Sequence, residues 1–165
     1  MSYQGRRLSV GELVELARRD SSLLADAPST PHCSYHAELC QDMLNAGDQL
    51  LDCWRFGVLQ LVDRYNSAAR RNDWDVARRL FEQPPSPTGS LQLDAAFAAL
   101  AEYLSVRDHW ATPTWAFEVE RSTVNAPWWV SLVISDGFRS EVESYCPSEF
   151  SKRGVFIGFG ALERA

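Results

Sequence analysis

The sequence lacks the features that define several large classes of protein. No stretch approaches the roughly 20 apolar residues that a membrane-spanning helix needs, so a membrane protein is not expected. The segment from Met1 to Arg7 leads into no apolar signal core, and we therefore expect a cytoplasmic protein. The four cysteines are too few and too unevenly spaced for a disulfide-built scaffold, which predicts reduced thiols.

Positive charge is also scarce. The 165 residues include 16 Lys or Arg against 22 Asp or Glu, which gives a net charge of −6, and Lys152 is the only lysine. Tight binding to a phosphate backbone requires a cationic surface, so nucleic acid is not expected as a partner of this chain alone. A neutral or basic protein fits the charge better, and association with a second copy of the chain stays open.

Apolar residues, by contrast, are plentiful. Hydrophobic residues make up 45 % of the chain and charged residues 23 %, which suits one globular domain with a continuous core. The patterning predicts an all-α, multi-helix domain with short helices and at most a brief extended segment near the C-terminus. Within this single domain we expect an N-terminal helix and connection at 1–31, a helical core at 32–108 and an aromatic-rich region at 109–165.

Caps and periodicity give the expected elements. Ser9 and Glu12 have capping-box spacing, and apolar residues recur at three- and four-residue steps further on. Segment 45–48 offers a glycine stop followed by Asp48 as a cap, which divides the long region 34–70 into two helices. The predicted helices cover residues 10–19, 34–70 in two parts, 73–82, 91–108 and 136–145, with a proline-rich loop at 84–89, a turn at 147–153 and an extended piece at 155–157.

Two of these helices carry specific expectations about burial. In the helix at 73–82, capped by Asn72 or Asp73, the side chains of Trp74, Ala77, Leu80 and Phe81 are expected to face inward. The helix at 91–108 is expected to bury one apolar stripe, formed by Leu93, Phe97, Leu100, Ala101 and Leu104.

The segment Cys33-x-x-His36-x-x-x-Cys40 is the sharpest chemical candidate. These positions share one face of a helix and could hold zinc through two sulfurs and an imidazole, with Cys53 as a fourth ligand. The same spacing is also that of a buried stripe, and cysteine is among the most buried residue types. Because no second paired motif closes the site, we favour the core interpretation and expect neither a metal nor a cofactor.

Catalytic arrangements are poorly supported. A triad needs a histidine base, and the chain offers only His32, His36 and His109, none with a convincing nucleophile nearby in sequence. The glycines at 154, 158 and 160 lack the lysine and hydroxyl of a phosphate-binding loop. We therefore expect a protein that is not an enzyme.

The aromatic tail suggests a binding surface. Trp, Tyr and Arg dominate protein interfaces, although more than half of these rings are expected to fill the core. Rings near prolines on short elements are the ones most expected to be exposed, which favours Trp128, Trp129 and Phe156. The complete set of predicted partner-binding residues is Trp115, Trp128, Trp129, Phe150, Arg153 and Phe156.

The same half of the chain carries a family resemblance. Pro113-Thr-Trp115, Ala126-Pro-Trp128-Trp129, the run from Cys146 to Phe156 and the closing Leu162–Ala165 occur in a characteristic order, preceded by the proline-rich loop and the segment 93–104. Across residues 50–165 the chain resembles actinobacterial, antitoxin-like helical proteins encoded beside nucleotidyltransferase-like toxins. Some relatives carry a helix-turn-helix module in front, which this chain replaces by a short helix and the cysteine–histidine segment. The resemblance implies a toxin partner and no active-site residues.

Three hypotheses of different classes follow. The first is an antitoxin-like protein that binds and neutralises a cognate toxin. The second is a transcriptional regulator whose N-terminal helices bind DNA. The third is a metal-stabilised helical domain that uses Cys33, His36 and Cys40.

Overall fold

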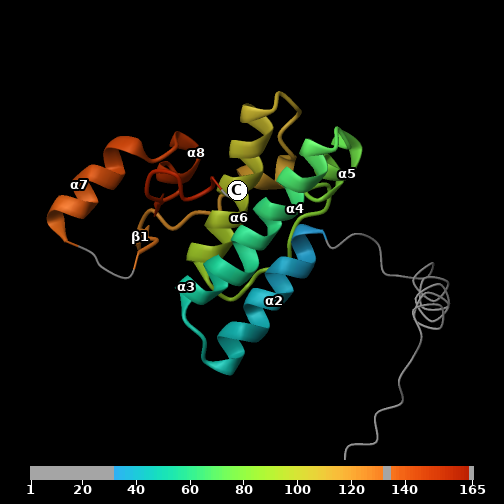
Figure 1. The fold of residues 1–165 in the computed structure, drawn as a ribbon. Coiled ribbons are helices and arrows are strands. Elements are labelled where there is room, and N and C mark those ends of the chain that lie inside the picture. The colour runs from blue at the N-terminus through green and yellow to red at the C-terminus, as the bar shows by residue number, and fades with distance from the viewer. Residues whose placement is uncertain (1–31, 132–134, 164–165) are drawn as a thin grey trace, which may run out of the picture.

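The computed structural model describes residues 32–131 and 135–163 and confirms the all-α prediction, including the brief extended segment (Figure 1). The predicted helix at 10–19 lies outside these residues. The elements, in chain order, are α2 (Cys33–Ala46), α3 (Leu50–Cys53), the π-helical η2 (Trp54–Val58), α4 (Leu59–Arg70), α5 (Trp74–Arg79), α6 (Leu91–Arg107), the 3-10 helix η3 (Thr114–Phe117), β1 (Trp128–Trp129), α7 (Asp136–Tyr145), α8 (Ser148–Ser151) and β2 (Val155–Phe156).

Helix α6 is the centre of the fold. The five residues of the predicted stripe are buried as expected, and burial extends beyond the stripe to every residue from Leu93 to Glu102. The alanines between the larger apolar side chains let neighbours approach on every side, and α2, η2, η3, α8 and β2 all contact this helix. A helix that is apolar all round belongs in a core. No helix within the described residues has both the length and the apolar character to cross a bilayer.

The few polar groups on α6 are matched by partners. Asp94 accepts a 2.8 Å hydrogen bond from the backbone N–H of Thr88, which fastens the proline-rich loop to the start of the helix. Ser105 donates to the carbonyl of Glu102 at 2.7 Å. Since buried polar groups are costly when unpaired, the bond from Thr88 to Asp94 determines where the loop before α6 can lie.

The break between α2 and α3 follows the sequence signal closely. Gly47 adopts a left-handed conformation with φ 94°, and its N–H and that of Asp48 donate to carbonyls of the last turn of α2. The predicted cap is displaced by one residue. Gln49, and not Asp48, is the N-cap residue of α3, and it forms a capping box with Asp52.

Helices α3, η2 and α4 run on from one another, with a π-helical turn in the middle. This turn brings Gly57 against α2, where a Cβ atom built on Gly57 would lie 2.2 Å from the Sγ atom of Cys40. The close approach of the two helices therefore requires glycine at this position.

Helix α5 begins at the predicted cap, since Asp73 accepts a hydrogen bond from the N–H of Val76. Ala77, Leu80 and Phe81 are buried as expected. The expectation that Trp74 faces inward is wrong, because 36 % of its surface is exposed. It stands at the first position of the short helix, where it lines a shallow groove with Arg70 and Arg107 instead of entering the core.

The C-terminal region closes onto α6 through a two-stranded parallel sheet. Trp128 pairs with Val155 and Trp129 with Phe156, so the predicted extended piece is confirmed as β2. Helix α7 has the predicted bounds and projects away from the helical core in Figure 1, with Val142 its only buried residue.

Replacing Gly57 by alanine is expected to lower the free energy of unfolding by about 2 kcal/mol, because the new methyl group overlaps the Cys40 thiol. Urea unfolding measures the change. Gly137→Ala is the matched control, since nothing lies within 4 Å of a Cβ there, and its effect is expected to stay within about 0.5 kcal/mol. Cys40→Ala combined with Gly57→Ala should recover part of the loss. A single variant as stable as the parent would contradict the contact.

Candidate functional site

The predicted cysteine–histidine segment lies inside the core. Cys33, His36 and Cys40 are buried on α2, and the thiols of Cys40 and Cys53 each point to the other's backbone carbonyl at 3.6 and 3.7 Å. Burial raises the pKa of the Cys40 thiol to about 12 and that of Cys33 still further, so both are protonated at neutral pH. Within ranges 32–131 and 135–163, no three His, Cys, Asp or Glu side chains form a group that could hold a metal ion.

His36 is a buried histidine without a hydrogen-bond partner on either ring nitrogen among the described residues. Burial, followed by the positive charge of Arg64, lowers its pKa to about 4, while the backbone of Gly57 acts weakly in the opposite direction. The imidazole is therefore neutral at physiological pH and fills space in the core.

Three of the six predicted partner-binding residues are buried, which corrects their assignment to a binding surface. Trp115 is 5 % exposed and donates its indole N–H to the carbonyl of Phe81 at 2.9 Å. Phe150 is fully buried, with its ring against Trp54 and Tyr103. These side chains attach the tail to the helical core, and Trp115 keeps only a small exposed part, which lines a cleft described below.

Arg153, the third of them, belongs to a buried ionic network. Its guanidinium lies 2.6 Å from a carboxylate oxygen of Glu102 and donates to the carbonyls of Ala116 and Glu149. Lys152 bonds to the other oxygen of Glu102. Burial alone would raise the pKa of Glu102, but the hydrogen bonds from Lys152 and Arg153 outweigh it and hold the pKa below its usual value. The network therefore fixes α8 to α6.

The other three predicted residues are half-buried, and two of them contact each other. Trp129 stacks on Phe156 across the two strands, with ring centres 4.9 Å apart, and the guanidinium of Arg139 lies 4.7 Å from the Trp129 ring. Trp128 packs edge-on against Trp54.

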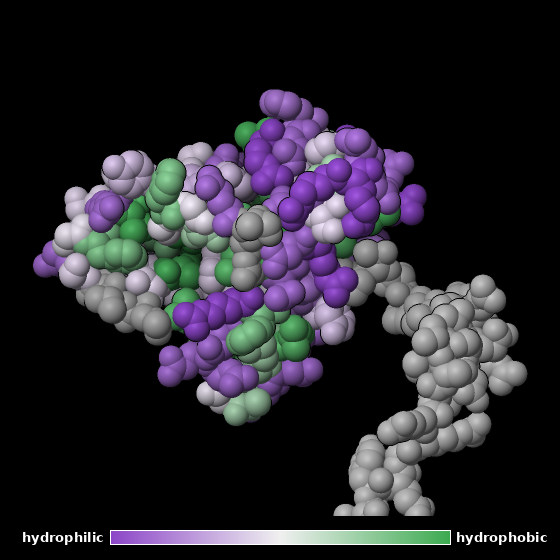
Figure 2. Space-filling view, viewed as in Figure 1, coloured by the Kyte–Doolittle hydropathy of each residue, from purple (hydrophilic) through white to green (hydrophobic). Residues whose placement is uncertain are grey.

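A second aromatic pair stands at the opposite end of α7. Tyr145 and Phe159 are 60 % and 85 % exposed and contact each other edge to face. We call the set Trp129, Arg139, Tyr145, Phe156 and Phe159 the α7 aromatic surface. Figure 2 shows apolar side chains gathered over the part of the molecule that contains α7, α8 and the strands.

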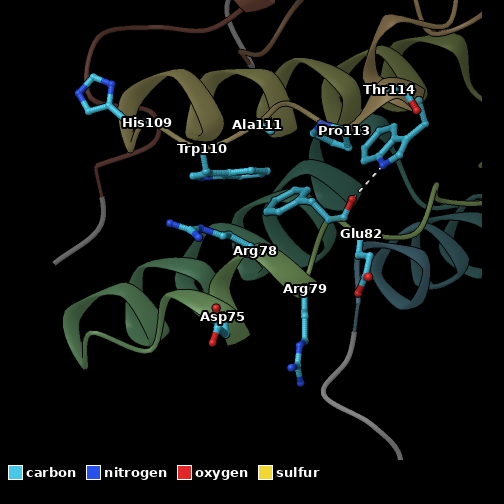
Figure 3. A pocket seen from close by; sticks show the side chains of 11 residues that line it. Asp75, Arg78, Arg79, Glu82, His109, Trp110, Ala111, Pro113 and Thr114 are labelled. Atoms are coloured by element: carbon cyan, nitrogen blue, oxygen red, sulfur yellow. Dashed lines mark hydrogen bonds between the residues drawn. The ribbon is translucent and has the colours of Figure 1, made fainter.

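A separate cleft of about 730 Å³ opens between α5 and the segment 109–115 (Figure 3). Its aromatic wall is held rigidly, because the indole of Trp110 donates to the hydroxyl of Tyr65, which in turn donates to Asp108. The lining residues are Asp75, Arg78, Arg79, Phe81, Glu82, His109, Trp110, Ala111, Pro113, Thr114 and Trp115.

The basic side of the cleft is also well anchored. The carbonyls of Arg79 and Leu80, at the end of α5, accept hydrogen bonds from the His32 ring and the Cys33 N–H at 2.8 and 2.7 Å. Neither Arg78 nor Arg79 has an ion-pair partner among the residues that the structure describes. Sequence reasoning missed this cleft because its two walls are about thirty residues apart in the chain, and the Arg78–Arg79 dipeptide was its only local signal.

The lining of the cleft is mixed, with charged and aromatic side chains. Its lining combines two guanidinium groups, two carboxylates and fixed rings, with Thr114 as the only hydroxyl among the lining side chains. In comparisons with family models, curated proteins and solved structures, nothing matched this chain.

The buried neutral state of His36 predicts a pH dependence. The unfolded chain takes up a proton near pH 6.5 and the folded chain only near pH 4, so the free energy of unfolding should fall as the pH drops through this interval. The loss attributable to His36 is expected to reach about 3 kcal/mol, measured by urea unfolding at a series of pH values.

His36→Leu should flatten this part of the profile, since no hydrogen bond is lost and no buried group remains to be charged. His109→Asn is the control, because His109 is exposed and has φ 57°, a conformation that asparagine tolerates. A His36→Leu profile as steep as that of the parent would show that His36 is not responsible.

Proposed function

We propose that this chain is an antitoxin-like protein that binds a partner protein and holds it inactive, with a nucleotidyltransferase-like toxin as the partner and the cytoplasm as the compartment. The observation that carries the proposal is the α7 aromatic surface, which exposes Tyr145 and Phe159 at one end of a helix that projects from the core and leaves the stacked pair Trp129 and Phe156 half-buried at the other end. The family resemblance of residues 50–165 supplies the class of partner.

The side chains of this surface suit a protein interface. Trp, Tyr and Arg supply most of the binding energy in interfaces, and aromatic side chains lose little conformational freedom when they are bound. Stacking of Trp129 on Phe156, with Arg139 above the ring, already restrains these side chains before binding. A partner therefore meets a surface that is largely ordered, which lowers the entropic cost of association.

The segment that carries the α7 aromatic surface is acidic. The stretch 136–149 contains four acidic residues and a single arginine, Arg139. An enzyme that handles nucleotides needs a cationic site for phosphate groups. An acidic helix with exposed rings is complementary to such a site, so occupation of it would block the substrate directly. This agrees with the neutral or basic protein partner expected from the net charge.

The proposal is tested by co-expressing the chain with the product of the co-transcribed neighbouring gene. The two proteins should co-purify, and growth arrest caused by the neighbour alone should be relieved. A neighbour that is neither toxic nor bound would end the proposal. A specific operator shift by this chain alone would favour the transcriptional regulator instead.

Within the complex, Tyr145→Ala combined with Phe159→Ala should weaken binding by about 30-fold, which corresponds to about 2 kcal/mol. Calorimetry measures the dissociation constant. Phe117→Ala combined with Val119→Ala is the matched control, since these residues are 59 % and 86 % exposed but lie outside the α7 aromatic surface. Equal losses in both double variants would place the interface elsewhere.

A further inference from the structure

The cleft beside α5 lies on a positively charged part of an otherwise acidic protein. Residues 55–82 contain six arginines against four acidic residues, whereas the whole chain carries a net charge of −6. Figure 2 shows a strongly hydrophilic surface over α5, at the upper right. A neighbouring groove of about 400 Å³ between α4 and α5 is lined by Arg64, Arg71 and Asp63, so arginines outnumber carboxylates there as well.

The arrangement inside the cleft combines charge with an apolar wall. In Figure 3 the side chain of Arg78 extends beneath the ring of Trp110, whereas Arg79 and Glu82 extend away from it. The guanidinium group presents a planar fork of donors that matches a carboxylate. A ligand that carries a carboxylate next to an apolar side chain would satisfy Arg78 and cover Trp110 together.

The acidic side chains in the lining of the cleft favour a ligand with carboxylates over one with phosphates. Asp75 and Glu82 also line the cleft, so a doubly charged phosphate would meet stronger repulsion than a single carboxylate. A peptide can place single negative charges at Arg78 and Arg79 and keep them apart from Asp75 and Glu82. The volume of about 730 Å³ suits several side chains of an extended segment.

We infer that this cleft binds an acidic peptide segment of a protein, with carboxylates on Arg78 and Arg79 and an apolar side chain against Trp110. The inference goes beyond the proposed function, because the cleft is separate from the α7 aromatic surface. Peptide binding can be measured with no toxin present. A chain that does not bind the peptide could therefore still bind a toxin, and a chain that does not bind a toxin could still bind the peptide.

The test uses a fluorescein-labelled twelve-residue peptide of alternating glutamate and leucine, with fluorescence anisotropy as the readout. Arg78→Ala combined with Arg79→Ala should raise its dissociation constant by about tenfold or more. Arg70→Ala combined with Arg71→Ala removes the same charge from the same hairpin outside the cleft and should change the constant by less than about threefold. Circular dichroism and thermal melting establish that each double variant is folded.

The binding position is read from the indole N–H resonances of Trp110 and Trp115, which should shift as the acidic peptide is added. Three results would overturn the inference: no binding of the acidic peptide, equal weakening by the two double variants, or no shift of either resonance. Tighter binding of the matching lysine–leucine peptide, or of ATP, would overturn it as well, since each would assign the cleft to a different ligand chemistry.

Discussion

The fold depends on the need to cover a helix that has no polar face. Because α6 carries apolar side chains on every side between Leu93 and Glu102, with Asp94 and Glu102 the only charged residues, it is stable in water only when other elements surround it. Helix α2 and the π-helical turn η2 cover part of it, and the segments around η3, α8 and β2 cover the rest. The C-terminal region is therefore part of the core rather than an appendage.

This requirement explains which aromatic side chains remain available. The most buried part of α6 contains two acidic residues, Asp94 and Glu102. Glu102 forms ion pairs with Lys152 and Arg153. Arg153 in turn binds the carbonyl of Ala116, so η3 and α8 meet at one point. Once these segments are fixed, Phe150 and Trp115 must be inside, and the rings next to α7 are left at the surface.

The sequence predicts the local structure of this chain better than its surfaces. The bounds of α7, the glycine end of α2 and the cap at Asp73 follow from nearby residues, because capping and periodicity are local effects. Long-range packing decides the rest. An arginine such as Arg153 has the composition of an interface residue, and only its distance from Glu102 reveals a structural role. The π-helical turn at 54–58 and the cleft beside α5 likewise depend on contacts between distant segments.

The facing thiols of Cys40 and Cys53 have a practical consequence. Both sulfurs are shielded from solvent and hydrogen-bonded to backbone carbonyls, so an alkylating reagent can reach them only when α2 separates from the π-helical turn. Cys146 is partly accessible and serves as an internal reference. The native chain thus contains its own reporter of local opening, and the rate of thiol modification gives the frequency of that motion without any added label.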